Sequence, residues 1–181
     1  MKTLAILRHA KSDWSDGRSR DFDRPLNARG IKGAGLMGDY IKSNHLQFDA
    51  VVASPAARVV ATLEQIETRL GIKLGTQWDR RIYLASSATL LELLREQSDT
   101  KSVVMIAGHN PGLEDLILEM VPDDGTSPMR DHVEEKFPTG ALAILKIDIA
   151  SWKDLGSAHA KLELLVRPRD IDPDLGPEVR H

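Results

Sequence analysis

The stretch "SVVMIAGHNPGLEDLILEMV", residues 102–121, contains a strand, a turn and a helix in succession. Residues 102–108 form an unbroken apolar run, which is typical of a strand covered on both faces in a parallel sheet. A polar turn that includes His109 follows, and the next residues have the apolar spacing of a helix opened by Pro111. The stretch therefore predicts an α/β fold and places an imidazole where a buried strand ends.

Two earlier stretches repeat this arrangement. In "LAILRHAKSDW", residues 4–14, an apolar strand is followed at once by Arg8 and His9. In "DAVVAS", residues 49–54, a short strand leads into a helix that we expect to be capped by Ser54, with Pro55 in its first helical position. That helix is predicted to end at Gly71, which suits a left-handed cap.

The rest of the chain continues the alternation of strands and helices. The predicted strands are residues 3–7, 49–54, 72–78, 102–108, 140–149 and 160–168, and the predicted helices are 28–44, 55–70, 89–97 and 110–121. Residues 11–27 and 122–136 are predicted loops. In helix 28–44 the expected inward positions are Ile31, Leu36, Met37, Tyr40 and Ile41. The tryptophans Trp14, Trp78 and Trp152 are expected to pack rather than to recognise a ligand.

This alternation predicts one α/β domain, a three-layer sandwich with a mostly parallel central sheet. The domain is expected to span residues 1–168, with an irregular C-terminal tail over residues 169–181. In such sheets ligands bind beyond the carboxyl ends of the strands.

Composition limits the classes of function. The 181 residues include no cysteine, which excludes disulfides, a thiolate nucleophile and thiolate metal sites. The net charge of −3 argues against nucleic acid or an anionic membrane as a partner. The N-terminal apolar run is too short for a signal peptide or a membrane span, so we expect a soluble, cytoplasmic protein.

The three strand ends together supply the parts of a phosphate site. Arg8 and His9 follow the first strand, Arg58 lies about one turn into the helix after Ser54, and His109 follows the third of these strands. Guanidiniums match the geometry of phosphate oxygens, and helix N-termini present free N–H groups to an anion. Ser12 and Asn110 are further candidates for contact with the phosphate or the substrate.

The motifs "LRHAKSDW", "SPAARVVAT" and "AGHNP" resemble, in this order, the signature of the histidine phosphatase superfamily, which has the phosphoglycerate-mutase-like fold. The further stretches "DRPLNARG", "GHNPGLEDL" and "FPTGALAIL" are similar to its SixA-type phosphohistidine phosphatase branch. The resemblance implies that His9 is the nucleophile and that Arg8, Arg58 and His109 clamp the phosphoryl oxygens, His109 as an imidazolium. It implies no metal and no cofactor.

A proton donor for the leaving group is harder to find. Mutases and many phosphomonoesterases of the superfamily use a carboxylate, but "WDRRIYLASSATLLELL", residues 78–94, contains no clear donor motif. Asp79 is a weak candidate there, and Glu92 reads as helix surface. The alternative is an acid from the loop over residues 11–27, which carries Asp13, Asp16, Asp21 and Asp23.

The missing donor favours a substrate with a labile N–P bond, because a protonated phosphoimidazole leaves as neutral imidazole whereas an alkoxide leaves poorly. We therefore expect a phosphatase that acts on phosphohistidine in a protein, such as a His-containing phosphotransfer domain. The alternatives are a phosphomonoesterase for a small phosphorylated metabolite and a non-catalytic phosphate-binding module. A mutase would need a donor acid and a second phosphate site.

Overall fold

The computed structural model describes residues 1–156 and 159–177, and in these ranges the chain forms a six-stranded sheet with the order β3-β2-β4-β1-β5-β6. The strands are β1 (Lys2–Arg8), β2 (Ala50–Ala53), β3 (Gln77–Trp78), β4 (Val103–Gly108), β5 (Leu142–Ile147) and β6 (Ala160–Val166). Strand β5 is antiparallel to both of its neighbours, and the other pairs are parallel. The prediction of a mostly parallel sheet is confirmed.

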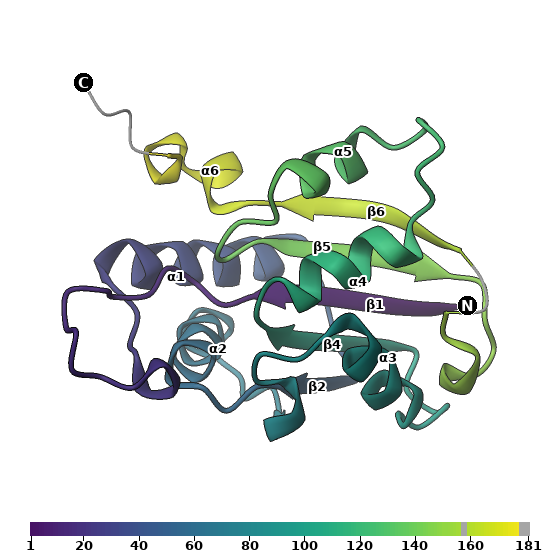
Figure 1. Cartoon of the computed structure of the whole chain (residues 1–181), viewed down its shortest axis with the longest axis horizontal. Helices are drawn as coiled ribbons and strands as arrows, with labels where there is room; N and C mark the ends of the chain where they lie inside the picture. The colour runs from purple at the N-terminus through teal and green to yellow at the C-terminus, as the bar shows by residue number, and fades with distance from the viewer. Residues whose placement is uncertain (157–158, 178–181) are drawn as a thin grey trace.

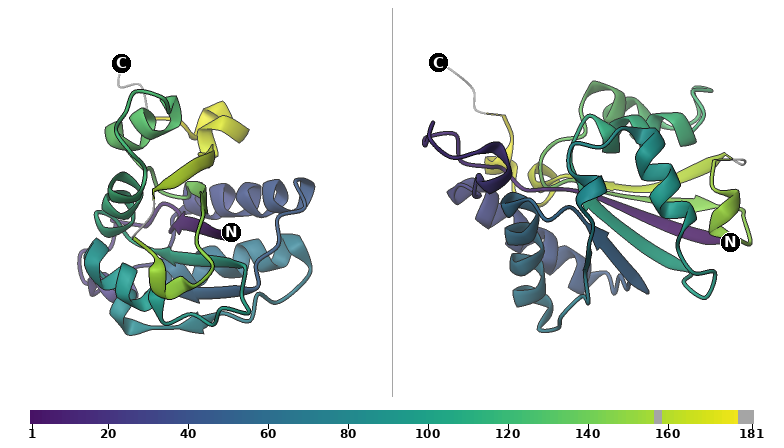
Figure 2. Two further views of the ribbon diagram at one scale, coloured as in Figure 1. Left: turned by 90° about the vertical axis from the view of Figure 1, so that its right-hand side faces the viewer. Right: turned by 60° about the horizontal axis from the view of Figure 1, so that its bottom comes forward.

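Helices cover both faces of the sheet, which gives the expected three layers (Figures 1 and 2). The helices are α1 (Ala28–Ser43), α2 (Ala57–Leu70), α3 (Ser87–Arg95), α4 (Gly112–Met120), α5 (Pro128–Glu135) and α6 (Pro168–Ile171). Helices α1 and α2 pack on one face, and α3 and α4 pack on the other. No helix within residues 1–156 and 159–177 is long and apolar enough to cross a membrane.

The register of the parallel strands aligns their carboxyl ends. Arg8 of β1 pairs with Gly108 of β4, and Ala53 of β2 pairs with Ala107 of β4. The arrowheads of β1 and β4 in Figure 1 point to the same side, where the loop over residues 11–27 and helix α6 also lie. This edge brings together the residues that follow the three strands.

Helix α1 packs differently from the prediction. Ile31 is 47% exposed, whereas the buried positions include several glycines. A Cβ at Gly38 would lie 3.1 Å from the Cα of Ile66 on α2, so glycine allows these two helices to approach closely. The expected inward position at Ile31 is therefore wrong, because the glycines form the contact face.

Two helices begin later than predicted. Helix α2 starts at Ala57, and its N-cap is Ala56 rather than Ser54. The hydroxyl of Ser54 accepts from the N–H of Ala56 at 3.3 Å and is also hydrogen-bonded to the Nε2 atom of His109. Helix α4 starts at Gly112, with Pro111 as its N-cap. The predicted end of α2 is confirmed, since Gly71 adopts a left-handed conformation with φ 71°.

The predicted loop over residues 122–136 is wrong in its second half. Helix α5 begins at Pro128, and the side chain of Ser127 accepts a hydrogen bond from the N–H of Arg130. The helix has a largely exposed polar surface and buries only Arg130 and Val133, which is why its apolar spacing is weak. Its start signal was present in the Ser-Pro pair.

The predicted third strand and two of the tryptophan assignments also need correction. Strand β3 covers only two residues of the expected seven. Trp152 is fully buried, as expected, but Trp14 is 74% exposed and Trp78 is 47% exposed.

The segment after β6 is more regular than the sequence predicts. It forms α6 and a 3₁₀ turn over Pro173–Leu175. Lys32 of α1 pairs with Asp172 at 2.7 Å, and the Arg29 guanidinium donates to the carbonyl of Gly176 at 2.9 Å. Residues 178–181 of the expected tail lie outside the described residues, and the domain boundary at residue 168 stays a prediction.

Candidate active site

The six predicted site residues line one cavity of about 590 Å³ at the carboxyl edge of the sheet. They are Arg8, His9, Ser12, Arg58, His109 and Asn110. Strand β1, helix α2 and the turn after β4 supply the four central side chains, Arg8, His9, Arg58 and His109, which we call the strand-end cluster.

His9 is held as a neutral imidazole with a defined tautomer. Its Nδ1 lies 2.7 Å from the carbonyl oxygen of Ala10, and because a carbonyl only accepts, Nδ1 carries the proton. Burial, with smaller contributions from the charges of Arg8 and Arg58, lowers the pKa of His9 to about 3. The Nε2 atom of His9 therefore keeps its lone pair at neutral pH.

His109 is also neutral in this geometry. Its Nδ1 accepts from the Arg58 guanidinium at 3.2 Å, and its Nε2–H donates to the hydroxyl of Ser54 at 2.8 Å. Burial and the charge of Arg58 lower the pKa of His109 to about 4. The expected imidazolium is not favoured here because guanidiniums surround the ring, although a phosphate dianion among them would favour protonation.

The two arginines of the cluster are buried and fixed by backbone carbonyls. Arg8 donates to the carbonyl of Phe137 at 3.1 Å, and Arg58 donates to the carbonyl of Asp21 at 2.7 Å. The Nε atoms of Arg8 and Arg58 are buried and have no hydrogen-bond partner among the described residues. Each guanidinium therefore has a donor that an oxyanion could satisfy.

Thr62 connects the two halves of the cluster. Its hydroxyl donates to the carbonyl of Arg58 at 2.6 Å and accepts from the N–H of Ala10 at 2.9 Å. Gly140, at φ 77°, donates to the carbonyl of His9 at 2.8 Å. The backbone around His9 is thus held by α2 on one side and by the segment before β5 on the other.

Asp21 is the loop aspartate that reaches the cavity. Its carboxylate accepts from Arg58 at 3.1 Å, from Arg24 at 2.7 Å and from the hydroxyl of Tyr83. The hydrogen bond from Tyr83, followed by the one from Arg24, lowers the pKa of Asp21 to about 2. Asp21 is therefore an ionised acceptor, which does not suit a proton donor.

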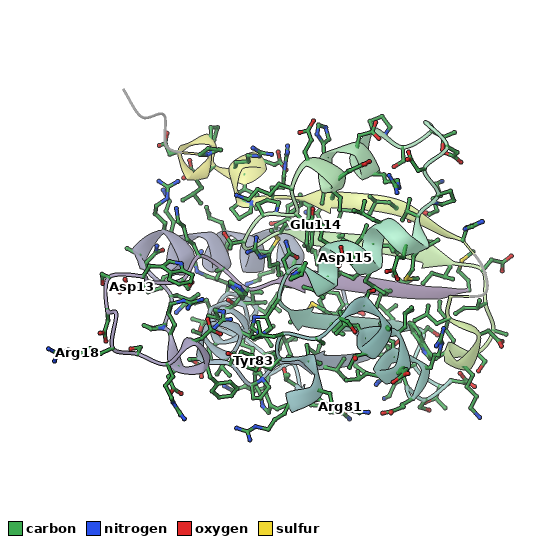
Figure 3. The ribbon with its side chains drawn as sticks, viewed as in Figure 1. Asp13, Arg18, Arg81, Tyr83, Glu114 and Asp115 are labelled. Carbon is green, nitrogen blue, oxygen red and sulfur yellow. The ribbon has the colours of Figure 1, made fainter. Side chains whose placement is uncertain are left out.

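The other candidate acids lie away from the cavity lining. Asp16, Asp23 and Glu92 are exposed and Asp13 is half-buried, and none of the four lines the cavity. Asp79 pairs with Arg81 at 2.8 Å beside a second surface cavity. The hydrogen bond from Arg81 lowers the pKa of Asp79. In the view of Figure 3, Asp13 lies on the loop at the left, and Arg81 lies on the other side of Tyr83 from Asp13. No predicted acid is therefore both protonated and at the cavity.

Ser12 and Asn110 line the cavity but are engaged by neighbours. The Ser12 hydroxyl accepts from Arg24 at 3.0 Å, and the Asn110 amide donates to the carbonyl of Phe137 at 2.8 Å. The Oδ1 atom of Asn110 is buried without a partner among the described residues. Their contact with a substrate stays a prediction.

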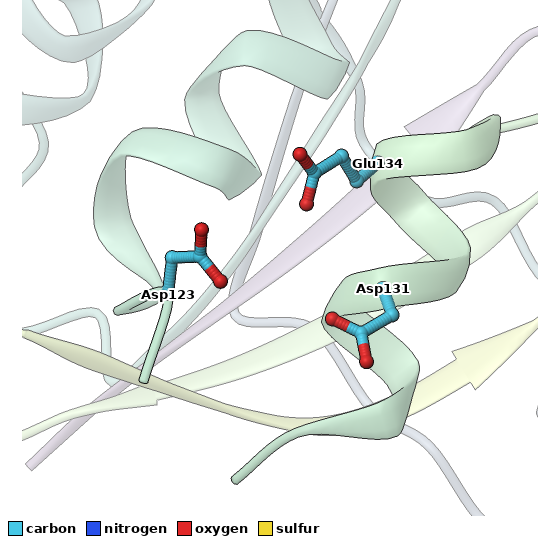
Figure 4. Close-up of side chains that lie close together, drawn as sticks. All are labelled: Asp123, Asp131 and Glu134. Atoms are coloured by element: carbon cyan, nitrogen blue, oxygen red, sulfur yellow. The ribbon is translucent and has the colours of Figure 1, made fainter. Parts of the chain in front are cut away.

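A cluster of three exposed carboxylates lies elsewhere, on α5 and the segment before it. Asp123, Asp131 and Glu134 bring carboxylate oxygens within 4.8 Å of one another (Figure 4). The guanidinium of Arg130 lies 3.5 Å from Asp123 and 3.0 Å from Glu134, so it already balances part of this charge. None of these three residues lines the cavity that contains the strand-end cluster.

Several residues in the cavity or beside it had no signal in the sequence analysis. Tyr83 packs edge-on against His109 with 5.4 Å between ring centroids, and Arg29, Arg167 and Arg169 line the far part of the cavity. Tyr83, Arg29 and Arg167 follow no predicted strand end, and Arg169 follows the strand predicted over residues 160–168, which is not one of the three strands expected to form the site. Only the fold, which brings α6 against the start of α1, places these arginines near the cluster.

Comparison with known proteins gives consistent matches. The family model of the histidine phosphatase superfamily (branch 1) matches residues 4–81. An uncharacterized protein of Mycobacterium tuberculosis is 34% identical over 157 residues, which cover 86% of this chain and 96% of that protein. The phosphohistidine phosphatase SixA of Escherichia coli (strain K12) is 25% identical over 145 residues, 79% of this chain and 84% of SixA.

A solved structure shows the same architecture. The structure of a candidate phosphohistidine phosphatase SixA from Nakamurella multipartitia matches with a TM-score of 0.78 and 28% identity. The match covers 92% of this chain and 96% of that one, so the likeness extends over the whole sheet and its helices.

Proposed function

The chain belongs to the histidine phosphatase superfamily and is a phosphatase, and on this premise we propose that it dephosphorylates phosphohistidine on a protein through a covalent intermediate on His9. The observation that carries the proposal is the state of His9. The carbonyl of Ala10 accepts a hydrogen bond from Nδ1–H, and burial keeps the ring neutral, so Nε2 is available as a nucleophile.

The reaction proceeds in two displacements. Nε2 of His9 attacks phosphorus, a P–N bond to His9 forms, and the P–N bond to the substrate imidazole breaks. Water then attacks the phosphoryl group, the P–N bond to His9 breaks, and phosphate leaves with one proton of that water released. Two easier steps replace one difficult one.

The guanidiniums supply the charge that this chemistry needs. Phosphoryl transfer is catalysed mainly by positioning and by cations on the equatorial oxygens. The buried Nε donors of Arg8 and Arg58 lack partners among the described residues, and they are suited to those oxygens. His109 becomes a stronger donor once the phosphate dianion raises its pKa.

The charge state of Asp21 supports an N–P bond as the target. Asp21 is ionised, so it cannot protonate a leaving oxygen. A phosphoimidazole that carries its own proton needs no such help, because it leaves as neutral imidazole. When an alkyl phosphate reacts, the P–O bond breaks and its alcohol would have to leave as an alkoxide, so such an ester would react slowly at this site.

The rim of the cavity supports a protein substrate. Trp14 is 74% exposed and Leu84 is 59% exposed, and both line the cavity. Trp14 lies flat against the Arg24 guanidinium, which is 3.6 Å from the ring centroid. Large apolar and aromatic side chains exposed together at a site are typical of protein contacts. The name of the Escherichia coli relative, a phosphohistidine phosphatase, points in the same direction.

A substrate panel tests this function. We expect a higher kcat/KM for a phosphohistidine-containing protein domain than for p-nitrophenyl phosphate or sugar phosphates. Acid-labile labelled phosphate should be trapped on the wild-type chain and be absent from His9→Ala. Much faster hydrolysis of a small phosphomonoester would identify a small-molecule phosphatase instead, and phosphate binding without turnover would identify a binding module.

A further inference from the structure

The cavity continues from the strand-end cluster to a second region beside α6. Here the lining comes from the start of α1, from Glu135 and Lys136, and from Arg167 onward, and it includes Arg29 and Arg169. We call this region the C-terminal arm. In Figure 1 helix α6 lies beyond the end of β6, on the same side as the carboxyl ends of β1 and β4.

The C-terminal arm lies next to the nucleophile. Gly140 donates its N–H to the carbonyl of His9, and a Cβ on Gly140 would lie 2.8 Å from Cγ of Pro168 and 4.0 Å from Cα of Ala10. The first residue of α6 therefore borders the residue that follows His9. A group attached to a phosphoryl at the strand-end cluster can extend directly along this arm.

The cavity lining carries more positive charge than the binding of one phosphate group requires. Its lining contains eight lysines and arginines but only two acidic residues, Asp21 and Glu135, although the whole chain has a net charge of −3. Arg8 and Arg58 belong to the strand-end cluster, and Arg24 is paired with Asp21 beside it. The remaining cations are at Lys11 and in the C-terminal arm, where the acidic residue is Glu135.

Not all of these cations are engaged within the protein. Arg167 is paired with Asp170 through two hydrogen bonds of 3.0 and 2.8 Å, and Arg29 donates to the carbonyl of Gly176. Arg169 and Lys136 make no side-chain hydrogen bond or ion pair with the described residues, and the Nε of Arg169 is buried without a partner there. Arg169 is therefore the main free donor of the arm.

We propose that the C-terminal arm is a second anion subsite, in which Arg169, with Lys136, binds a carboxylate or phosphate on the leaving group of the substrate. This proposal rests on the proposed function only in placing the reacting phosphoryl group at the strand-end cluster. The segment after β6 thereby becomes part of the substrate site. A guanidinium is suited to this role because its fork matches both kinds of oxyanion.

Binding of non-hydrolysable phosphonates tests the subsite without any need for turnover. The probes are alkylphosphonates of three to six methylenes that end in a carboxylate or in the neutral carboxamide. Calorimetry on the wild type should show tighter binding of the carboxylate at one or more lengths, by about tenfold for a charge-assisted hydrogen bond. Equal affinities at every length would overturn the proposal.

Two substitutions locate the effect. Arg169→Gln should remove the preference for the carboxylate and leave the affinity for the carboxamide unchanged. Arg18→Gln is the matched control, because it removes the same charge from a side chain that points away from the body of the molecule in Figure 3. If Arg169→Gln proves unstable, Lys136→Gln at an exposed position should reduce the preference. A preference that survives both Arg169→Gln and Lys136→Gln contradicts the assignment.

Hydrolysis assays distinguish the sources of the second anion. One pair is a phosphohistidine peptide flanked by Asp or by Asn, and the other is a small phosphomonoester with a carboxylate or an amide on its leaving group. An Arg169-dependent preference in the first pair indicates an acidic side chain of a protein, and in the second pair a small metabolite. If phosphohistidine is not hydrolysed while the phosphonate preference persists, the proposed function fails and the subsite stands.

Discussion

The strand-end cluster and the C-terminal arm form two ends of one cavity but are built in different ways. In the cluster, His9, Arg58 and His109 are at most 6% exposed and are fixed by carbonyls and by Thr62. The arm depends on α6, a helix of one turn, which is attached to α1 through the pair of Lys32 with Asp172 and the hydrogen bond of Arg29.

This difference indicates that the strand-end cluster determines the reaction, whereas the C-terminal arm determines which leaving group is accepted. Side chains carried by buried strands cannot move without disturbing the core, so the geometry around the phosphoryl group is tightly determined. Side chains on a short surface segment can change at little cost to stability, so the leaving-group side can differ while the reaction stays the same. The following substitutions test this division.

The largest effect is expected for Arg58→Ala in the strand-end cluster. Loss of one positioned cation from a transition state of this kind costs roughly 10²–10³-fold in kcat. Because Arg58 donates to Asp21 and to His109, the substitution also frees two neighbours of the phosphoryl group. We expect kcat/KM to fall by that amount for every substrate, with or without an anionic leaving group.

Two further variants serve as controls for the loss of activity in Arg58→Ala. Arg58→Lys keeps the charge but loses the planar fork, so it should recover only part of the rate. Arg81→Ala removes an exposed arginine that pairs with Asp79 and Glu96 outside the cavity, and it should leave kcat/KM within about twofold. Comparable losses in Arg58→Ala and Arg81→Ala would contradict the division between cluster and surface.

The next effect concerns stability against pH. His9 has a pKa of about 3 in the folded chain and 6.5 as its ordinary value. Between these values the unfolded chain binds a proton that the folded chain does not, so stability increases with pH through this window. The contribution of His9 is complete above pH 6.5 and is lost progressively as the pH falls toward 3.

Urea unfolding at several pH values measures this contribution. The free energy of unfolding of the wild type should fall between pH 6.5 and 4 more steeply than that of His9→Gln. The difference between the two should change by on the order of 2 kcal/mol over this range. The titration of His109 and of the carboxylates contributes to the pH dependence of both proteins, so these contributions cancel in the difference between their free energies of unfolding. Parallel curves would show that His9 is not held neutral by the fold.

A smaller effect is expected for Thr62→Val. The substitution keeps the shape but leaves the N–H of Ala10 and the carbonyl of Arg58 without the hydroxyl that joins them. Leaving a buried donor unsatisfied costs about 1–3 kcal/mol. We also expect kcat to fall more than KM changes, because Ala10 carries the carbonyl that orients His9.

Thr68→Val on the same helix is the matched control. Its hydroxyl donates to the carbonyl of Glu64 at 2.9 Å, but it is exposed, so water can replace the bond. Its effect on the free energy of unfolding should be within about 0.5 kcal/mol, with kcat unchanged. A Thr62→Val variant as stable and as active as Thr68→Val would mean that Thr62 does not position the cluster.

The same division explains what the sequence could predict. Arg8, His9 and His109 follow apolar runs, which predict buried strands. The parallel register of these strands then brings their ends together. The contact of Ser54 with His109 could not be predicted, because Ser-Pro before a helix also fits a simple cap. The role of Asp21 depends on a loop of 17 residues whose path no periodicity specifies.

The C-terminal arm was missed for a similar reason. Residues 169–177 are rich in proline and charge, which predicts an irregular surface segment from composition. Their position is set by long-range contacts with α1, and Gly33 leaves the space that Pro168 approaches, at 3.6 Å from a Cβ placed there. Such contacts are invisible until the fold brings distant segments together.

The smallest effect on stability is expected for Lys32→Ala, which breaks the pair with Asp172 at the base of the arm. The lysine side chain is 54% exposed, so solvent screens the pair and the melting temperature should change little. If α6 presents Arg169 through this attachment, the carboxylate preference in phosphonate binding should weaken, whereas affinity for the carboxamide probes should not. Lys32→Arg keeps the pair with Asp172 and should keep the preference. A uniform loss of affinity for both probes would instead mean that the arm supports the strand-end cluster, and the two ends of the cavity would then be less independent than their construction indicates.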